Sequence, residues 1–350
     1  MTQMKKKIVI ATDNLLLTDY AKTAHGLIRG TKRFEVLAII DEKNKNTDAG
    51  ETLDGTFRNI PVIASIDEAI KTFDTIDYLV IGVATIGGVL SNTLLNIISE
   101  AITKGIGIVN GLHDQLNERE EIALLAEAAQ VELIDIRKPK SIKEMHFWTG
   151  DIFKVDIPII AFLAMDCAMG KRTLATLVVE ECLKKNMRAE MIYTGQTGWM
   201  QGNKYGFIFD STLNDFVSGE LEHAITRCWK EEKPDLILLE GQSSLRNPSG
   251  PCGLEFIISG NATQVVLIHA PKKKYFDNDP LWGEIPSVES EIEIIEKFGS
   301  TVIALALNTS GLTKSEAIYH QARYKESLGI PVVMPLEEGV TNIISEIKGL

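Results

Sequence analysis

The 350-residue chain has little cysteine and no long hydrophobic run. Its four cysteines, Cys167, Cys182, Cys228 and Cys252, never have the C-x-x-C spacing of a zinc or redox site. No apolar stretch approaches the roughly 18–20 residues of a membrane span, and the apolar run 8–11 is too short for the core of a signal peptide. We therefore expect no disulfide framework and no membrane partner, and we place the protein in a reduced cytoplasm.

Long basic runs are also missing. The chain carries 36 Lys and Arg against 48 Asp and Glu, a formal net charge of −12, so it is a poor candidate for binding nucleic acid. Lys272–Lys274 is a local basic cluster, either a solvated turn or an anion-binding loop. With 45% hydrophobic and 24% charged residues the composition is that of a globular protein. The length suggests two domains of about 150 residues.

Short β-rich runs alternate with helical patterns along most of the chain. This alternation predicts βαβ units and the α/β fold class, with two doubly wound, mostly parallel sheets. We expect a first domain in residues 1–140, a linker in 141–156 and a second domain in 157–350. The expected strands are 7–11, 34–40, 60–63, 78–83, 107–109 and 131–136, then 157–163, 189–193, 236–239, 265–268, 302–307 and 331–334.

The strongest motif is a buried strand, a loop of small residues and a Gly-Lys pair that opens an apolar-periodic helix. In this context loop amides and a helix N-terminus face one anion, and the lysine adds a charge, as in a P-loop. The match to G-x-x-x-x-G-K-[ST] is imperfect, because the residue after the lysine is Arg172 and the hydroxyl that normally contacts Mg²⁺ is missing. The residues expected to bind a cofactor here are Asp166, Cys167, Ala168, Met169, Gly170, Lys171, Arg172 and Thr173.

Polar residues also follow other strands of the second domain. Ligands of open α/β sheets bind beyond the carboxyl ends of the strands. Glu240 can hold a metal, orient a nucleophile or only cap its strand, and His269 is either catalytic or structural. Asn308 is expected to read a base edge of the cofactor. The residues expected to bind substrate are Thr194, Gln196, Thr197, Gln242, Ser243, Ser244 and Arg246, although Arg246 also fits a solvated loop.

The first domain lacks the glycine-rich turn of a dinucleotide site. Its first strand is followed by Ala11-Thr12-Asp13-Asn14-Leu15 rather than G-x-G-x-x-G, although Asp41 closes the second strand, where an acid can bind a ribose. We therefore expect this domain to shape the acceptor site or an oligomer interface rather than to hold NAD.

Two resemblances follow from these residues. Ala164–Lys171 and Glu240-Gly241 make the C-terminal half similar to P-loop proteins of the dethiobiotin synthetase type. The whole chain more closely resembles a family of D-glutamate (D-amino-acid) N-acetyltransferases, long catalogued as of unknown function, with a Rossmann-like N-terminal domain and a P-loop NTPase-like C-terminal domain. Four stretches carry it: 111–113, 135–139, 166–171 and 240–244. Ala164 and Ser243 depart from it, since relatives often have Gly there.

The resemblance implies transfer of an acetyl group from acetyl-CoA to the amino group of D-glutamate or a similar amino acid. The P-loop then holds the phosphates of coenzyme A, Glu240 or His269 is the general base, and Arg172 or Arg246 binds a carboxylate. Cys167 fits either an acyl-carrying nucleophile or a small filler of the loop. The amount of apolar sequence favours a homo-oligomer.

Two alternatives stay open. One is an ATP- or GTP-dependent ligase or kinase of the dethiobiotin synthetase type, with Mg²⁺ held by Asp166 and Glu240. The other is a non-enzymatic, nucleotide-binding regulator.

Overall fold

The protein is described by a computed structural model of residues 5–347. Residues 1–4 and 348–350, the outer ends of the two expected domains, lie outside the described part. The chain forms two compact units: the N-terminal unit consists of Met1–Pro139 and Gln196–Asn203, and the C-terminal unit of Lys140–Gly195 and Lys204–Leu350. Residues 141–156, expected as a linker, thus belong to the C-terminal unit, and the chain passes between the units three times.

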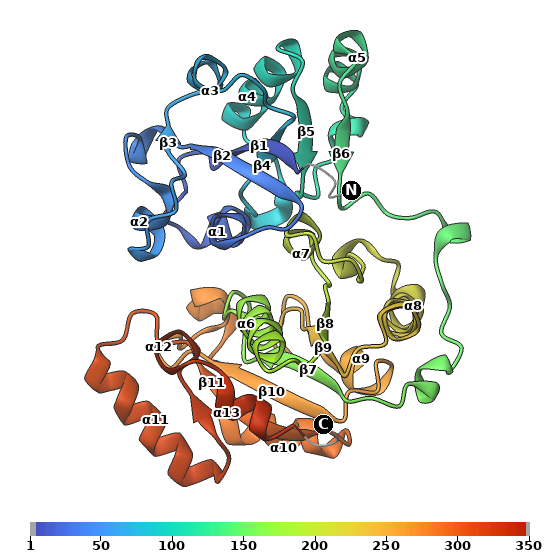
Figure 1. The fold of residues 1–350 in the computed structure, drawn as a ribbon. Helices are drawn as coiled ribbons and strands as arrows, with labels where there is room; N and C mark the ends of the chain where they lie inside the picture. Colours follow the sequence, from blue (N-terminus) through green and yellow to red (C-terminus); the bar gives the residue numbers. More distant parts are fainter. Residues whose placement is uncertain (1–4, 348–350) are drawn as a thin grey trace. The chain divides into compact units, whose positions relative to one another are not determined.

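The N-terminal unit is built on a six-stranded parallel sheet with the strand order β3-β2-β1-β4-β5-β6 (Figure 1). This is the strand order of a Rossmann fold. The strands are β1 Lys6–Ala11, β2 Phe34–Ile40, β3 Val62–Ile63, β4 Tyr78–Ile81, β5 Gly107–Asn110 and β6 Leu133–Asp135. The helices are α1 Lys22–Arg29, α2 Ala49–Asp54, α3 Ile66–Thr72, α4 Asn92–Thr103, α5 Glu120–Ala129 and α7 Gln196–Met200.

The C-terminal unit has a second six-stranded parallel sheet, ordered β12-β11-β10-β7-β9-β8 (Figure 1). The strands are β7 Ile159–Ala164, β8 Ala189–Ile192, β9 Leu236–Glu240, β10 Gln264–His269, β11 Thr301–Leu307 and β12 Val332–Val333. The helices are α6 Lys171–Lys184, α8 Asn214–Glu232, α9 Leu254–Ile258, α10 Val288–Lys297, α11 Lys314–Leu328, α12 Pro335–Glu338 and α13 Thr341–Ser345.

The order of this sheet places β7 at its switch point. From β7 the chain runs through α6 to β8 and β9 on one side, and it then returns to β10 on the other side of β7. Ligands of open α/β sheets bind beyond the carboxyl ends of the strands at such a point. The loop after β7 is therefore where a ligand site is expected.

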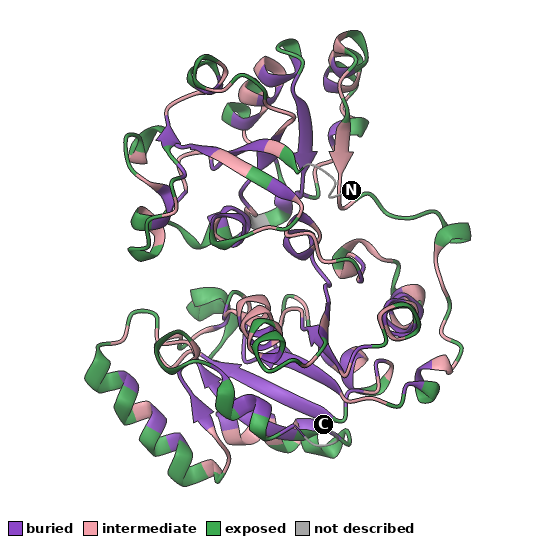
Figure 2. Cartoon of the chain, viewed as in Figure 1, coloured by how far each residue is buried: buried purple, intermediate pink, exposed green. Residues whose placement is uncertain are grey.

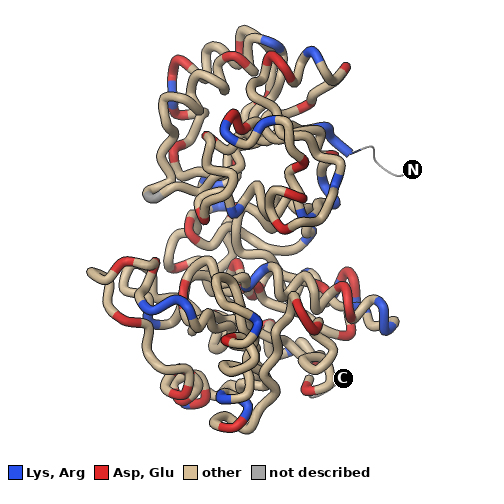
Figure 3. Tube along the Cα trace, turned by 90° about the vertical axis from the view of Figure 1, so that its left-hand side faces the viewer, with Lys and Arg blue, Asp and Glu red and all other residues tan. Residues whose placement is uncertain are grey.

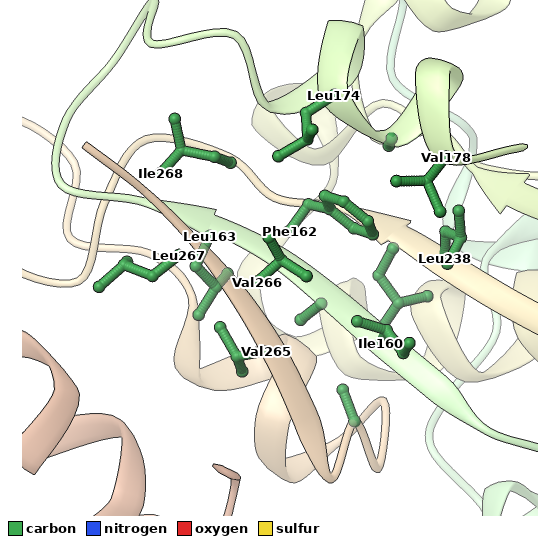
Figure 4. Packing of buried hydrophobic residues seen from close by; sticks show 14 of the residues in the cluster. Ile160, Phe162, Leu163, Leu174, Val178, Leu238, Val265, Val266, Leu267 and Ile268 are labelled. Atoms are coloured by element: carbon green, nitrogen blue, oxygen red, sulfur yellow. The ribbon is translucent and has the colours of Figure 1, made fainter. Parts of the chain in front are cut away.

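Helices cover both sheets, so the central strands are buried on both faces. All six residues of β7 are buried, as is typical of a parallel strand between two helical layers (Figure 2). Leu174 and Val178 of α6 pack next to Phe162 of β7 in the main core of the C-terminal unit (Figure 4). This packing fixes the start of α6 against the end of β7.

The predicted fold class is confirmed. Each of the twelve expected strand runs overlaps a strand, and every strand pair is parallel. Helical patterns in the sequence predict helices over 19–29, 67–73, 90–104, 118–129, 171–185, 215–230, 288–297, 314–327 and 340–348, and each of these overlaps a helix. Four short helices, α2, α7, α9 and α12, were not predicted, because four to six residues are too few to show a helical period.

Acidic and basic residues are interspersed along the trace of both units (Figure 3). Within residues 5–347, no helix combines the length and the apolar character needed to cross a membrane.

Candidate functional site

The loop between β7 and α6 has the backbone of an anion-binding turn. Ala168 and Gly170 both adopt left-handed conformations, with φ of 55° and 100°, and such turns direct successive amides towards one side. A Cβ added at Gly170 would meet no atom within 4 Å, so the space beside this residue is open. The 14-residue helix α6 begins directly after it and adds its positive end. The loop can therefore receive a phosphate, and residues 166–171 are called the phosphate loop below.

Lys171 connects this loop with the segment that follows β9. Its Nζ donates hydrogen bonds to the carbonyl oxygens of Asp166, at 3.1 Å, and Ser243, at 2.6 Å. The thiol of Cys167 lies 3.6 Å from the hydroxyl oxygen of the same serine. Ser243 itself has a left-handed φ of 38°. The structure thus brings together two of the four stretches that carry the family resemblance, 166–171 and 240–244.

Asp166 is fully buried and is the centre of a polar network. Its Oδ1 accepts a hydrogen bond from Asn247 Nδ2 at 2.7 Å, and its Oδ2 accepts one from the amide of Asp277 at 2.8 Å. Lys273 Nζ lies 2.6 Å from Oδ2 and also donates to the carbonyl of Cys167 at 3.2 Å. Asn247, Lys273 and Asp277 were missing from the sequence-based site. Only the triple lysine gave a signal, and it fitted a solvated turn equally well.

Glu240 lies at the end of β9 with 5% of its surface exposed. Burial raises the pKa of its carboxyl group, and the charge of Arg172 opposes that rise. Arg172 Nη1 is 3.6 Å from Oε1, and the amide of Thr194 donates to Oε2 at 3.2 Å. Gln242 Nε2 donates to the Thr194 hydroxyl at 3.1 Å. The structure thus groups three predicted residues, Arg172, Thr194 and Gln242, around one buried acid.

The glycine after Glu240 has a steric role. A Cβ at Gly241 would lie 2.3 Å from the carbonyl oxygen of Phe162, so only glycine lets β9 pass so close to β7. This contact keeps Glu240 next to the phosphate loop.

His269 packs away from this group, against α11. Its Nε2 is 3.1 Å from the hydroxyl of Tyr324, and its buried Nδ1 has no hydrogen-bond partner. Burial, together with the charges of His320 and Arg323, lowers its pKa to about 4. The ring is therefore neutral near pH 7 and is held by a structural contact.

Two further candidates are engaged in internal contacts. Arg246 Nε lies 2.6 Å from Oε2 of Glu291, a buried acid on α10, and its Nη1 donates to Ser290. Asn308 Nδ2 donates to the carbonyl of Met169 in the phosphate loop at 3.1 Å, and its Oδ1 accepts from the next-but-one amide. Asn308 thus supports the phosphate loop, while Arg246 anchors α10.

Ser244 fixes nearby backbone, and Thr173 lies at the start of α6. The Ser244 hydroxyl accepts the amide of Asn247 at 3.1 Å. Thr173 is half-buried in the first turn of α6.

Gln196 and Thr197 belong to the N-terminal unit. Gln196 Oε1 accepts a hydrogen bond from Arg137 Nη2 at 3.1 Å, and the hydroxyl oxygens of Thr197 and Thr23 are 3.1 Å apart. Both residues lie in α7, which packs with the first 139 residues. Their side chains therefore serve the N-terminal unit, although they follow β8 of the C-terminal unit, which ends at Ile192.

Asp41, the acid at the end of β2, is also used inside the N-terminal unit. It is 1% exposed, and its carboxylate accepts hydrogen bonds from the Thr12 hydroxyl at 2.7 Å and the Leu16 amide at 3.0 Å. The carboxylate of Asp41 therefore holds the loop after β1 in place. In a dinucleotide-binding sheet, the acid at this position binds a ribose of the cofactor instead.

The acids expected to hold Mg²⁺ do not fit that ion. Asp166 is paired with Lys273 at 2.6 Å and Glu240 faces Arg172 at 3.6 Å. Ligand atoms of Asp166, Cys167 and Asp277 do lie within 4.8 Å of one another, but the ammonium group of Lys273 already contacts this cluster. A phosphate-bearing cofactor fits better, because the loop amides, the open space at Gly170 and Lys171 all favour an anion.

The fold and this site define a two-unit α/β protein with a Rossmann-like sheet and a phosphate-binding loop. Residues 146–344 match the profile of the DUF1611 C-terminal P-loop domain, a domain of unknown function. Residues 42–139 match that of the DUF1611 N-terminal Rossmann-like domain, also of unknown function. The chain belongs to the DUF1611 family, which confirms the resemblance seen in the sequence.

Relatives match over most of the chain. A Pseudoalteromonas protein named D-glutamate N-acetyltransferase is 30% identical over 276 residues, which is 77% of this chain and 80% of the relative. A Tritonibacter scottomollicae protein of the same name is 25% identical and covers 78% of this chain and 81% of its own length. The crystal structure of a DUF1611 protein from Anabaena variabilis, 24% identical, superposes with a TM-score of 0.89 and covers 98% of this chain and 99% of that one. It shows the same fold.

Proposed function

We propose that the protein is an N-acetyltransferase that moves an acetyl group from acetyl-CoA to the amino group of D-glutamate or a similar amino acid. The observation that carries the proposal is a buried, charge-paired glutamate beside an open phosphate loop, in a chain similar to two proteins named D-glutamate N-acetyltransferase. Coenzyme A is an anion with several phosphate groups, and this loop has the donors for one.

The phosphate loop holds the donor in this proposal. The amides of residues 166–170 and the N-terminus of α6 bind a phosphate, and Lys171 Nζ is close enough to contribute its charge. When bound, acetyl-CoA supplies the activated acetyl thioester.

Glu240 is the general base. The ammonium group of the acceptor must lose one proton before its nitrogen can attack the acetyl carbonyl, and a carboxylate can take it. As the C–N bond forms, the thioester C–S bond breaks, and the second proton of the nitrogen leaves with coenzyme A as its thiol. Burial raises the pKa of Glu240 above the ordinary glutamate value, which makes it a stronger proton acceptor, while Arg172 keeps it ionisable. We assign no proton transfer to His269, because its pKa of about 4 makes it a weak base and its Nε2 contacts Tyr324.

The acceptor lies next to Glu240. Arg172, at the start of α6, provides the positive charge for a substrate carboxylate, and Gln242 and Thr194 provide polar contacts. Arg246 has no part in this proposal, since its guanidinium is bound to Glu291.

Substituting the two candidate bases separately tests the proposal. Release of coenzyme A thiol is followed with acetyl-CoA and D-glutamate, with L-glutamate in parallel. We expect E240Q to lower kcat at least about 100-fold, the usual effect of losing a general base, and H269Q to stay within about threefold of the wild type. The wild-type rate should rise with pH through a pKa above the ordinary glutamate value, because Glu240 acts only when ionised.

Three results would contradict the proposal. The first is unchanged acetyl transfer in E240Q. The second is loss of activity in H269Q alone, which would move the base to His269. The third is thermal stabilisation by ATP with Mg²⁺ together with ATP hydrolysis, while coenzyme A gives no stabilisation. This result would support the ligase or kinase class instead.

A further inference from the structure

We propose that Lys273 is the resident cation of the phosphate loop, so that the loop binds its phosphate ligand without a divalent metal ion. The inference rests on the proposed function in one respect: it requires a phosphate-bearing ligand at residues 166–171. It goes beyond that function because it makes Lys273 a positioning residue and because phosphate binding then needs no metal ion.

The contacts of Lys273 place its charge on the loop itself. Its Nζ lies 2.6 Å from Asp166 Oδ2 and donates to the carbonyl of Cys167 at 3.2 Å. The side chain is only 12% exposed, and that of Asp166 is fully buried. Lys273 therefore contacts two consecutive residues of the turn that receives the phosphate.

A buried carboxylate in this position needs a partner. An isolated ionised acid is costly to bury, and its charge would repel a phosphate bound a few ångströms away. Lys273 removes both problems, since it neutralises Asp166. In Mg²⁺-dependent P-loops a divalent ion, held partly by an acid, supplies positive charge near the phosphates.

The rest of the network keeps Lys273 and its loop in place. Asn247 Nδ2 donates to Asp166 Oδ1 and lies 3.0 Å from Asp277 Oδ2, while the amide of Asp277 donates to Asp166 Oδ2. The segment that follows β10 thus contacts Oδ2 of the carboxylate, and Asn247, from the segment that follows β9, contacts Oδ1. Lys273 is held in this geometry rather than extended into solvent.

The other features of a magnesium site point the same way. Arg172 stands where a Ser or Thr hydroxyl would bind the ion, and it faces the second acid, Glu240, at 3.6 Å. Each acid that follows a strand here is thus paired with a cationic side chain of the chain itself.

The neighbouring lysine supplies a matched control. Lys274 is 62% exposed, and its Nζ is paired with Glu284, which is 64% exposed. K273M and K274M remove the same charge and differ by one position, so a general effect of net charge alters both variants equally.

The experiment is calorimetric titration of the full-length protein with coenzyme A and, separately, with ADP, each in EDTA and in excess MgCl₂. We expect the wild-type Kd for coenzyme A to agree within about twofold in the two buffers. K273M should bind at least about tenfold more weakly, as expected when one charge of a buried pair is lost, and K274M should bind like the wild type. The double variant D166N/K273M should recover part of the loss, because it also removes the unpaired carboxylate.

Each other outcome counts against the inference. A wild-type affinity that falls about tenfold or more in EDTA would make a metal the cation. Unchanged binding by K273M, or no recovery in D166N/K273M, would remove Lys273 from that role. If circular dichroism shows that K273M does not fold, two measurements still test the inference. They are the wild-type Kd in EDTA against that in MgCl₂, and the Kd of D166N/K273M.

The ligand that binds separates the two proposals. Metal-independent binding of ADP, with none of coenzyme A, would support the role of Lys273 and contradict the acetyltransferase. Binding of neither ligand would contradict both.

Discussion

Asp166 and Glu240 lie at the carboxyl ends of the neighbouring strands β7 and β9, and each has a carboxylate in the protein interior. Asp166 is paired at 2.6 Å with Lys273 and receives two further hydrogen bonds, so its charge is fully compensated. Glu240 has a longer contact, 3.6 Å to Arg172, and its pKa is raised by burial. Because of this difference in pairing, we propose a structural role for Asp166 and proton transfer for Glu240.

Sequence position located both acids but not their partners. Each follows a hydrophobic strand, which predicts an acid at the ligand edge of the sheet. Lys273 lies more than 100 residues from Asp166, and no local pattern specifies that contact. The pairing depends on how the segment after β10 folds back.

His269 gives a prediction at the residue scale. Its pKa is lowered from 6.5 to about 4 by burial, so the folded protein binds fewer protons than the unfolded chain and loses stability as the pH falls from about 6.5 towards 4. Between pH 7.5 and 5 this one group accounts for about 2 kcal/mol of lost unfolding free energy. Urea unfolding at the two pH values should show a loss smaller by about that amount in H269Q.

The control is L124Q, which changes an exposed side chain without a titratable group on α5. It should lose stability between the two pH values as the wild type does. An equal loss in the wild type and H269Q would show that His269 is accessible to protons in the folded state.

At the scale of elements, residues 140–152 are fastened to α8 by two buried glutamates. Glu220 accepts the His146 amide at 2.8 Å and contacts Lys140 Nζ at 2.5 Å. Glu222 accepts the amides of Thr149 at 2.6 Å and Ile152 at 3.1 Å. This segment lacks strong periodicity, so the sequence predicted only a linker. Its order comes from side-chain acceptors on a helix more than 60 residues later.

Gly219 tests this contact. A Cβ there would lie 2.1 Å from the carbonyl oxygen of His146 and 2.5 Å from the carbonyl carbon of Phe147. Alanine is the better helix former by about 1 kcal/mol, so G219A would stabilise a helix with a free face. We expect it instead to lower the unfolding free energy by about 1–3 kcal/mol, the usual cost of overpacking, measured by urea unfolding.

The control is K230A on an exposed position of the same helix. It should change the free energy of unfolding by less than about 0.5 kcal/mol. Stabilisation by G219A would contradict the close packing of residues 146–147 on α8.

At the scale of the whole molecule, eight residues from the second half of the sequence complete the N-terminal unit. The segment Gln196–Asn203 packs with the first 139 residues. Met200 is fully buried in the same cluster as Ile8, Ile10 and Val80. The guanidinium carbon of Arg33 lies 4.0 Å from the ring centroid of Trp199, and its Nε donates to that residue's carbonyl at 2.7 Å. The N-terminal unit is therefore discontinuous in sequence.

Met200→Ala should destabilise this unit by about 2–5 kcal/mol, as expected for a large-to-small core change. Hydrogen exchange followed by mass spectrometry should show faster exchange in β1, β2 and α1 than in β7–β12, although residue 200 follows β8 in the chain. M191A, a buried position on β8, is the matched control and should have the opposite distribution. Faster exchange in β7–β12 upon M200A would place α7 in the C-terminal core.

The sequence by itself determined the two parallel sheets, the phosphate loop and the strand ends that carry polar residues. These features depend on local patterns: the alternation of apolar strands with helices, and a glycine and a lysine at the start of a helix. Only the tertiary structure decided that Lys273 neutralises Asp166, that His269 turns to α11 and that α7 belongs to the N-terminal unit. Each of these contacts joins residues distant in sequence. It forms because a buried charge, ring or short helix requires a partner that the local sequence does not specify.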